Sequence, residues 1–176
     1  LITHLKNGKV LEGEHVLSDY QLVSKFGIKK MLLQPKAIAN PHAIKAIEEA
    51  DVIVVGPGNL YASLIPNFLV TGIGKALAKS KAKKVYVANL MNKHGHTDDF
   101  TVADYVASLE GVIGKKGVFE TVVYNTKKPA ASLVRKYADE GEPVSFDPQK
   151  ADTNAVYIGA DLLADGIAKT AKKDLL

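Results

Sequence analysis

The chain has 176 residues, 47% of them hydrophobic and 24% charged, which suits one domain with a sizeable core. It has no cysteine, which excludes disulfides, thiolate catalysis and cysteine-ligated zinc, and no apolar run near the ~20 residues of a membrane span, so a cytoplasmic location is expected. The net charge is +4, but the lysines are scattered and Arg135 is the only arginine, so nucleic-acid binding is not expected.

The N-terminal segment has the pattern of a β-hairpin. Residues 1–6 and 9–11 are half apolar, and Asn7-Gly8 between them is the strongest two-residue turn signal. A further strand is predicted over Ile28 to Gln34, ended by Pro35.

From residue 40 a regular alternation of strand, polar loop and helix begins. Asn40 is suited to cap a helix whose first position is Pro41. Short apolar runs at 51–55, 84–88 and 120–124 predict buried strands, each followed by a loop and a helical pattern. The predicted helices run through Leu69 to Leu77, where Pro66 should start or kink the helix, through Val102 to Ile113, and from Pro129 to Gly141. Residues 143–146 and 156–158 predict two more strands.

This alternation predicts a Rossmann-like, three-layer α/β fold with a mostly parallel sheet, preceded by the β-hairpin. Residues 1–176 are expected to form a single domain. Right-handed crossovers place every strand-to-helix loop at the carboxyl edge of the sheet, where open α/β folds bind ligands. The loops can therefore converge on one site.

The first of these loops contains Gly56, Gly58 and Asn59. Glycines allow a ligand to approach backbone amides closely, and the following helix start favours phosphate. The spacing matches neither a Walker loop nor GxGxxG. By itself the pattern fits a plain tight turn as well as a ligand loop.

The second loop, residues 89–99, is long and polar, which is typical of functional loops. His94, His96 and Asp98 suggest a metal site, but Thr97 to Asp99 also stand where a helix cap and acidic first turn belong. We favour capping and ligand hydrogen bonds, so no metal ligand is assigned.

Two asparagines, Asn89 and Asn125, end buried strands at the same edge. Their amides can donate to and accept from a nucleotide without a charge penalty, although asparagine is also common in turns. The sequence has no Gly-x-Ser-x-Gly elbow and no evident hydrolytic triad, so no catalytic residue is assigned.

Two stretches carry a family resemblance. Residues 51–70, DVIVVGPGNLYASLIPNFLV, resemble the signature of the YvcK-like gluconeogenesis factors, as do residues 85–91, VYVANLM, followed by Gly95 to Asp98. These proteins are related in fold to the phospholactate transferase of coenzyme F420 biosynthesis. The likeness also takes in Tyr137 and Gly141.

The resemblance implies a Rossmann-like regulator that binds UDP-N-acetylglucosamine and links carbon metabolism to cell-wall precursor supply and cell shape, without a cofactor. Its implied ligand residues are Gly56, Gly58, Asn59, Asn89, Asn125, Tyr137 and Lys169. Asn59 stands where the family usually has serine, and Lys169 stands where it often has arginine. A lysine ammonium group is a point charge and cannot make the two parallel hydrogen bonds of an arginine guanidinium group. A regulatory protein partner and a homo-oligomer are possible.

The family opens with a glycine-rich strand-to-helix loop that this sequence lacks, and residue 1 is leucine, so the chain is expected to be the later part of a longer protein. The alternative function is a phospholactyl-type transferase using a guanosine diphosphate-linked donor and Mg²⁺, with Asp98 or Asp99 as the candidate ligand. A nicotinamide-dependent oxidoreductase is disfavoured by the missing GxGxxG.

Overall fold

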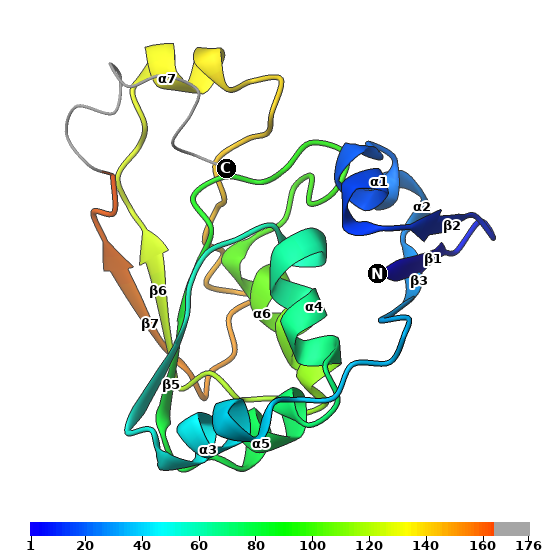
Figure 1. The fold of residues 1–176 in the computed structure, drawn as a ribbon. Coiled ribbons are helices and arrows are strands. Elements are labelled where there is room, and N and C mark those ends of the chain that lie inside the picture. The colour runs from blue at the N-terminus through cyan, green and yellow to red at the C-terminus, as the bar shows by residue number, and fades with distance from the viewer. Residues whose placement is uncertain (164–176) are drawn as a thin grey trace.

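A computed structural model describes residues 1–163 and builds them into two sheets (Figure 1). One is antiparallel with strand order β2-β1-β3, and the other is parallel with order β4-β5-β6-β7. The α/β class with a mostly parallel sheet and an N-terminal hairpin is thereby confirmed. None of the helices in residues 1–163 is long and apolar enough to cross a membrane.

The strands are β1 Ile2–Leu5, β2 Val10–Glu12, β3 Ile28–Leu32, β4 Val52–Val55, β5 Lys83–Val87, β6 Thr121–Asn125 and β7 Val156–Ala160. The helices are α1 Glu14–Asp19, α2 Val23–Phe26, α3 Pro41–Glu49, the π-helical turn η1 Leu60–Leu64, α4 Ile65–Leu69, α5 Ile73–Lys79, α6 Val102–Ile113 and α7 Ala131–Lys136.

Residues 1–32 form a small N-terminal lobe with its own core. The predicted hairpin turns at Asn7-Gly8, and β3 joins it as a third, antiparallel strand. Helices α1 and α2, which the sequence did not indicate because each is only a turn or so long, close the lobe over four buried apolar side chains. These are Leu5, Leu11, Leu17 and Val23.

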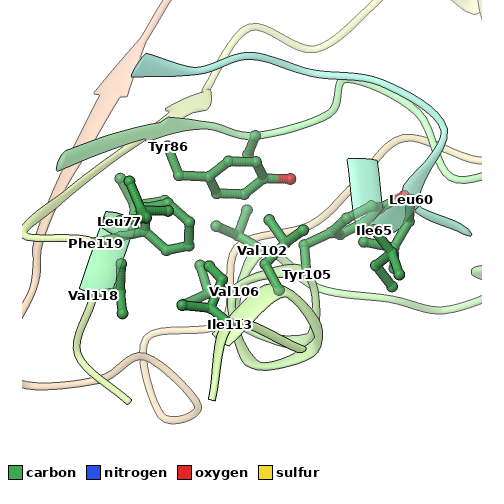
Figure 2. Close-up of a cluster of buried hydrophobic side chains, with 13 residues drawn as sticks. Leu60, Ile65, Leu77, Tyr86, Val102, Tyr105, Val106, Ile113, Val118 and Phe119 are labelled. Atoms are coloured by element: carbon green, nitrogen blue, oxygen red, sulfur yellow. The ribbon is translucent and has the colours of Figure 1, made fainter. Parts of the chain in front are cut away.

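The main core lies between one face of the parallel sheet and helices α4, α5 and α6. Figure 1 shows these helices on one side of the strands, and Figure 2 shows Tyr86 of β5 above Val102 and Val106 of α6. Tyr86, Leu109 and Val122 are fully buried. Burial of this hydrophobic cluster, together with the hydrogen bonds between the parallel strands, fixes where the carboxyl end of each strand lies relative to its neighbours.

A buried carboxylate fixes the start of β6. Glu110 of α6 is 6% exposed, and its Oε1 accepts hydrogen bonds from the backbone N–H groups of Val118 (2.7 Å) and Phe119 (3.4 Å). These amides precede the strand and would otherwise be buried without a partner, which is costly.

Three predictions about elements were wrong. Residues 143–146 are not a strand but an extended segment that makes only isolated bridges, Met91 with Pro143 and Thr101 with Ser145. The helical stretch after residue 59 is not continuous: η1 is followed by α4, which has Pro66 in its first turn as expected, and the chain turns at Gly72, whose φ is 108°, before α5. Helix α6 is capped by Thr101 with Asp104 in a capping box, not by Thr97 to Asp99.

Candidate functional site

The loop after β4 begins the site at the carboxyl edge. Asn59 caps η1, because its Oδ1 accepts hydrogen bonds from the backbone N–H groups of Tyr61 (3.2 Å) and Ala62 (3.1 Å). Within residues 1–163 its Nδ2 donates no hydrogen bond. The capping oxygen is therefore committed to the fold, while the amide nitrogen remains able to donate to a ligand.

The two glycines of this loop differ. A Cβ atom on Gly58 would lie 3.1 Å from the Cδ2 of Leu64, so the loop packs tightly on η1 there. A Cβ atom on Gly56 would meet nothing within 4 Å. Gly56 therefore borders open space, into which a ligand can approach the backbone.

Asn89 joins the first loop to the second. Its Nδ2 donates a 2.8 Å hydrogen bond to the carbonyl oxygen of Gly58, and its Oδ1 accepts one from the hydroxyl of Tyr86 at 3.3 Å. Residues 31 positions apart in the sequence thus meet at the edge of β4 and β5.

Asn125 joins the loops after β6 and β7 in the same manner. Its Oδ1 accepts hydrogen bonds from the N–H groups of Lys127 and Leu162, both at 3.2 Å. Lys127 also forms a 2.9 Å ion pair with Asp161. Neither Lys127 nor Asp161 was singled out in the sequence, since a lysine in a polar loop carries no signal by itself.

The rest of the second loop, residues 92–99, is a latch onto the N-terminal lobe. Ser24 of α2 donates from its Oγ to the Oδ2 of Asp98 (2.5 Å) and from its N–H to the carbonyl of Gly95 (2.8 Å). The Nζ of Lys93 donates to the carbonyl oxygen of Ser18 at 2.6 Å. This loop therefore holds two parts of the molecule together, and Lys93 is committed to a backbone contact.

His96 lies at the centre of the latch and is only 1% exposed. Among residues 1–163 neither ring nitrogen of His96 has a hydrogen-bond partner, and the ring lies 6.3 Å from that of Tyr61, centroid to centroid. Burial, followed by the nearby charge of Lys93, lowers the pKa of His96 to about 4. Burial also raises the pKa of Tyr61 to about 12. Both side chains are therefore neutral at pH 7.

The geometry does not favour a metal site formed by His94, His96 and Asp98. His94 Nδ1 lies 2.9 Å from Asp98 Oδ1, and the His94 side chain is exposed whereas His96 is buried. Burial opposes ionisation of Asp98, but hydrogen bonds from Ser24 and the Gly95 N–H hold its pKa below the usual value. Across residues 1–163, no three carboxylate or histidine side chains gather as metal ligands would.

Two predicted site residues remain, Tyr137 and Lys169. Tyr137 ends α7, with its N–H bonded to the carbonyl of Leu133, and the Nζ of Lys136 lies 5.4 Å from its ring centroid. Lys169 lies outside the described residues. A cavity of about 290 Å³ also lies away from the loops. It is lined by Met31, Leu32, Leu33, Lys36, Leu69 and Thr71.

Several known proteins resemble this chain in sequence. The family model described as 2-phospho-L-lactate transferase CofD matches residues 1–163. The gluconeogenesis factor of Bacillus subtilis is 35% identical over 178 aligned positions, which cover 100% of this chain and 53% of the relative. That of Listeria monocytogenes is 30% identical over 97% of this chain and 52% of the relative.

A solved structure extends the comparison. A crystal structure of a UPF0052 family member from Bacillus halodurans superposes with a TM-score of 0.84 and 31% identity, over 94% of this chain and 53% of that one. The chain thus spans about half the length of these relatives. It belongs to the CofD family, and the curated relatives it resembles are gluconeogenesis factors.

Proposed function

We propose that the chain is part of a cytoplasmic regulator that binds a UDP-sugar, UDP-N-acetylglucosamine above all, and does not turn it over. The contact between Asn89 and the Gly58 carbonyl carries the proposal, because it brings two polar, glycine-bearing loops to one point of the carboxyl edge. The kinship with gluconeogenesis factors supports a regulatory role. That role would couple carbon metabolism to cell-wall precursor supply and cell shape through a protein partner.

In this proposal the diphosphate lies over Gly56, where the backbone borders open space. The free Nδ2 of Asn59 donates to it, and the positive end of η1 and α4 favours its charge. Asn89 and Asn125 hold their loops in place and present backbone groups to the sugar or base. Two further residues contact the ligand in this proposal: Tyr137 stacks on a ring, and Lys169 holds a phosphate.

A titration by calorimetry tests the proposal, comparing UDP-N-acetylglucosamine, UDP-glucose, UDP and GDP with and without Mg²⁺. The informative variant is Gly56→Leu, which places a side chain in the open space beside Gly56, where a Cβ atom meets nothing within 4 Å. Gly111→Leu is the matched control, because a Cβ there also meets nothing within 4 Å but lies on the exposed side of α6.

We expect UDP-sugar binding without Mg²⁺ that Gly56→Leu weakens at least ~100-fold, about 2.7 kcal/mol, and that Gly111→Leu leaves unchanged. The proposal is wrong if no nucleotide sugar binds to the chain, either alone or together with the part of a full-length relative that this chain does not match. Equal binding by Gly56→Leu would remove the assigned site.

A second candidate is a transferase, favoured by the description of the matching family model. It requires a guanosine diphosphate-linked donor and Mg²⁺. Residues 1–163 do not fit a metal centre well, since no three carboxylate or histidine side chains gather there as ligands. Mg²⁺-dependent release of free GDP, lost in Asp98→Asn or Asp99→Asn, would favour this candidate over the regulator.

A further inference from the structure

A cleft with apolar walls lies between strand β3 of the N-terminal lobe and helix α4. It is the cavity of about 290 Å³ described above, and we call it the β3–α4 cleft. Its lining includes Leu32, Leu33 and Leu69, which are half-buried, and Lys36 and Thr71, which are exposed. Figure 1 shows the segment after β3 running past α4 toward α3. The cleft therefore offers apolar contact beside a cationic group.

Backbone hydrogen bonds hold one side of the cleft in place. The N–H of Ala39 donates to the carbonyl oxygen of Thr71, and the N–H of Thr71 donates to the carbonyl oxygen of Ala37, both at 3.0 Å. These bonds pair Thr71 with Ile38, which is 79% exposed. A single exposed apolar side chain is ordinary, but Ile38 adjoins a residue of the cleft, so the apolar surface continues beyond it.

The cleft carries positive charge without a counter-charge from its own walls. Residues 20–47 contain five lysines and no Asp or Glu, and residues 52–97 contain no Asp or Glu either. Across the sheet from Leu32, Glu12 lies two strands away on β2, a separation of roughly 10 Å. Within the described chain, Lys36 forms no ion pair. Its ammonium group is therefore available to an anionic partner.

The shape and chemistry of the cleft favour a protein segment as the occupant. Small-molecule pockets usually enclose ~300–1,000 Å³ and carry buried polar groups that orient the ligand, whereas Lys36 and Thr71 are exposed. Single-stranded nucleic acid is bound by aromatic side chains and arginine, and the lining of the cleft has neither. An apolar hollow with a charge at its rim instead suits an anchoring side chain of a protein.

We propose that the β3–α4 cleft docks an acidic segment of a partner protein. An apolar side chain of the segment enters beside Leu33 and Leu69, and a neighbouring carboxylate pairs with Lys36. The inference rests on the proposed function only in that a regulator acts through a protein partner. The nucleotide loop at Gly56 takes no part in the docking.

Selection from a library of random peptides displayed on phage tests the docking without any nucleotide. The library is first depleted on Thr71→Trp, whose bulky side chain occupies the cleft, so that peptides bound to other surfaces are removed. It is then selected on the wild-type chain, and enriched peptides are synthesised and titrated by fluorescence anisotropy. Lys36→Glu and Lys36→Met are the informative variants. Lys81→Glu is the matched control, because Lys81 is also exposed but lies outside the cleft.

We expect the enriched peptides to combine Asp or Glu with a large apolar residue, and their affinity to fall as the salt concentration rises. Lys36→Glu should weaken binding at least tenfold, Lys36→Met should weaken it less and reduce the salt dependence, and Lys81→Glu should leave it unchanged. Circular dichroism melting verifies that each variant folds. Lys36→Glu should bind UDP-N-acetylglucosamine as the wild type does, which separates a failure of this docking from a failure of the nucleotide proposal.

Several outcomes would overturn the docking. No enrichment, peptides without acidic residues, or equal binding to Lys36→Glu and the wild type would each remove it. Displacement of the peptides by a short single-stranded oligonucleotide would identify nucleic acid as the occupant. A homodimer that Thr71→Trp dissociates would identify a second copy. Displacement by the part of the Bacillus subtilis factor that this chain does not match would show that the cleft is covered within the longer protein.

Discussion

Two loops at the same edge of the sheet, which look alike in the sequence, have different structural roles. The loop after β4 is short, and Gly56 within it borders open space. The loop after β5 is long, and its residues 92–99 bind the N-terminal lobe through hydrogen bonds to Ser24 and Ser18. Polarity alone therefore does not identify a ligand loop, because hydrogen-bonding side chains serve a latch equally well. Substitutions in the two loops should separate binding from stability.

The largest effect on stability is expected for Gly95→Ala in the latch. Gly95 has a φ of 76°, and a Cβ atom there would lie 2.2 Å from the carbonyl oxygen of Gln21. Left-handed strain and a clash with backbone should together lower the free energy of unfolding by about 2–5 kcal/mol. Urea denaturation measures this change.

Gly111→Ala is the control for that substitution. It lies in α6 with open space around its Cβ position, so alanine should raise stability by about 0.5–1 kcal/mol. If Gly95→Ala lowers the free energy of unfolding by no more than ~0.5 kcal/mol, the latch is not packed as described.

The next effect is a pH dependence due to His96. Its pKa is lowered to about 4 in the folded state, against about 6.5 when unfolded, so the unfolded chain binds the extra proton between these values. Stability from this group is therefore complete above pH 6.5 and falls as the pH drops toward 4. Near pH 5 the loss should be about 2 kcal/mol.

Urea unfolding at pH 7 and pH 5 checks this, with His96→Phe as the comparison. The variant should lose that part of the pH dependence, because phenylalanine takes no proton. The lowered pKa of Asp98 acts below this range, since a carboxylate loses its contribution only as the pH approaches its unfolded pKa of about 4. Identical pH profiles would contradict the burial of a neutral His96.

A smaller effect is expected at Asn59 in the first loop. Asn59→Ala removes the cap of η1 and should lower stability by about 1 kcal/mol, whereas Asn59→Ser keeps a capping oxygen and should change it by less than about 0.5 kcal/mol. Thermal unfolding of both variants measures the difference. Equal losses would show that capping is not the role of this side chain.

The smallest effect should be that of Gly56→Ala. A Cβ atom there meets nothing within 4 Å, so stability should change by less than about 0.5 kcal/mol. A loss above ~1 kcal/mol in urea denaturation would mean that the loop is packed, and the contrast between the two loops would disappear.

Periodicity predicted the repeating part of the fold well. The apolar runs at 51–55, 84–88 and 120–124 form strands β4, β5 and β6 as predicted. The predicted burial was wrong for β4, because this strand ends the sheet within residues 1–163 and its Val52 and Val54 are more than half exposed. The sequence pattern did not predict helices α1 and α2, since they are too short to show a helical period. Residues 143–146 have strand-like composition but serve as an extended link, which depends on tertiary contacts with Met91 and Thr101.

The meeting of the strand-to-helix loops was predictable from the sequence, but the roles of their side chains were not. Parallel topology places Gly58, Asn59 and Asn89 at one edge, and the structure brings Gly58 and Asn89 into contact. The roles of the side chains follow from distances that no spacing encodes, such as the capping by Asn59 and the anchoring of the loop by Asn125. Nothing in the sequence separated His96 from His94, although one is buried and the other is exposed.

The latch also has a consequence for the order in which the chain folds. Its contacts join residues far apart along the chain: Ser24 and Asp98 are 74 positions apart, and Ser18 and Lys93 are 75 apart. Closing so long a loop is entropically slow, whereas the hairpin and the βα units form from near neighbours. The N-terminal lobe should therefore dock late and detach first, as a separate cooperative unit whose amides exchange with solvent before those of the parallel sheet.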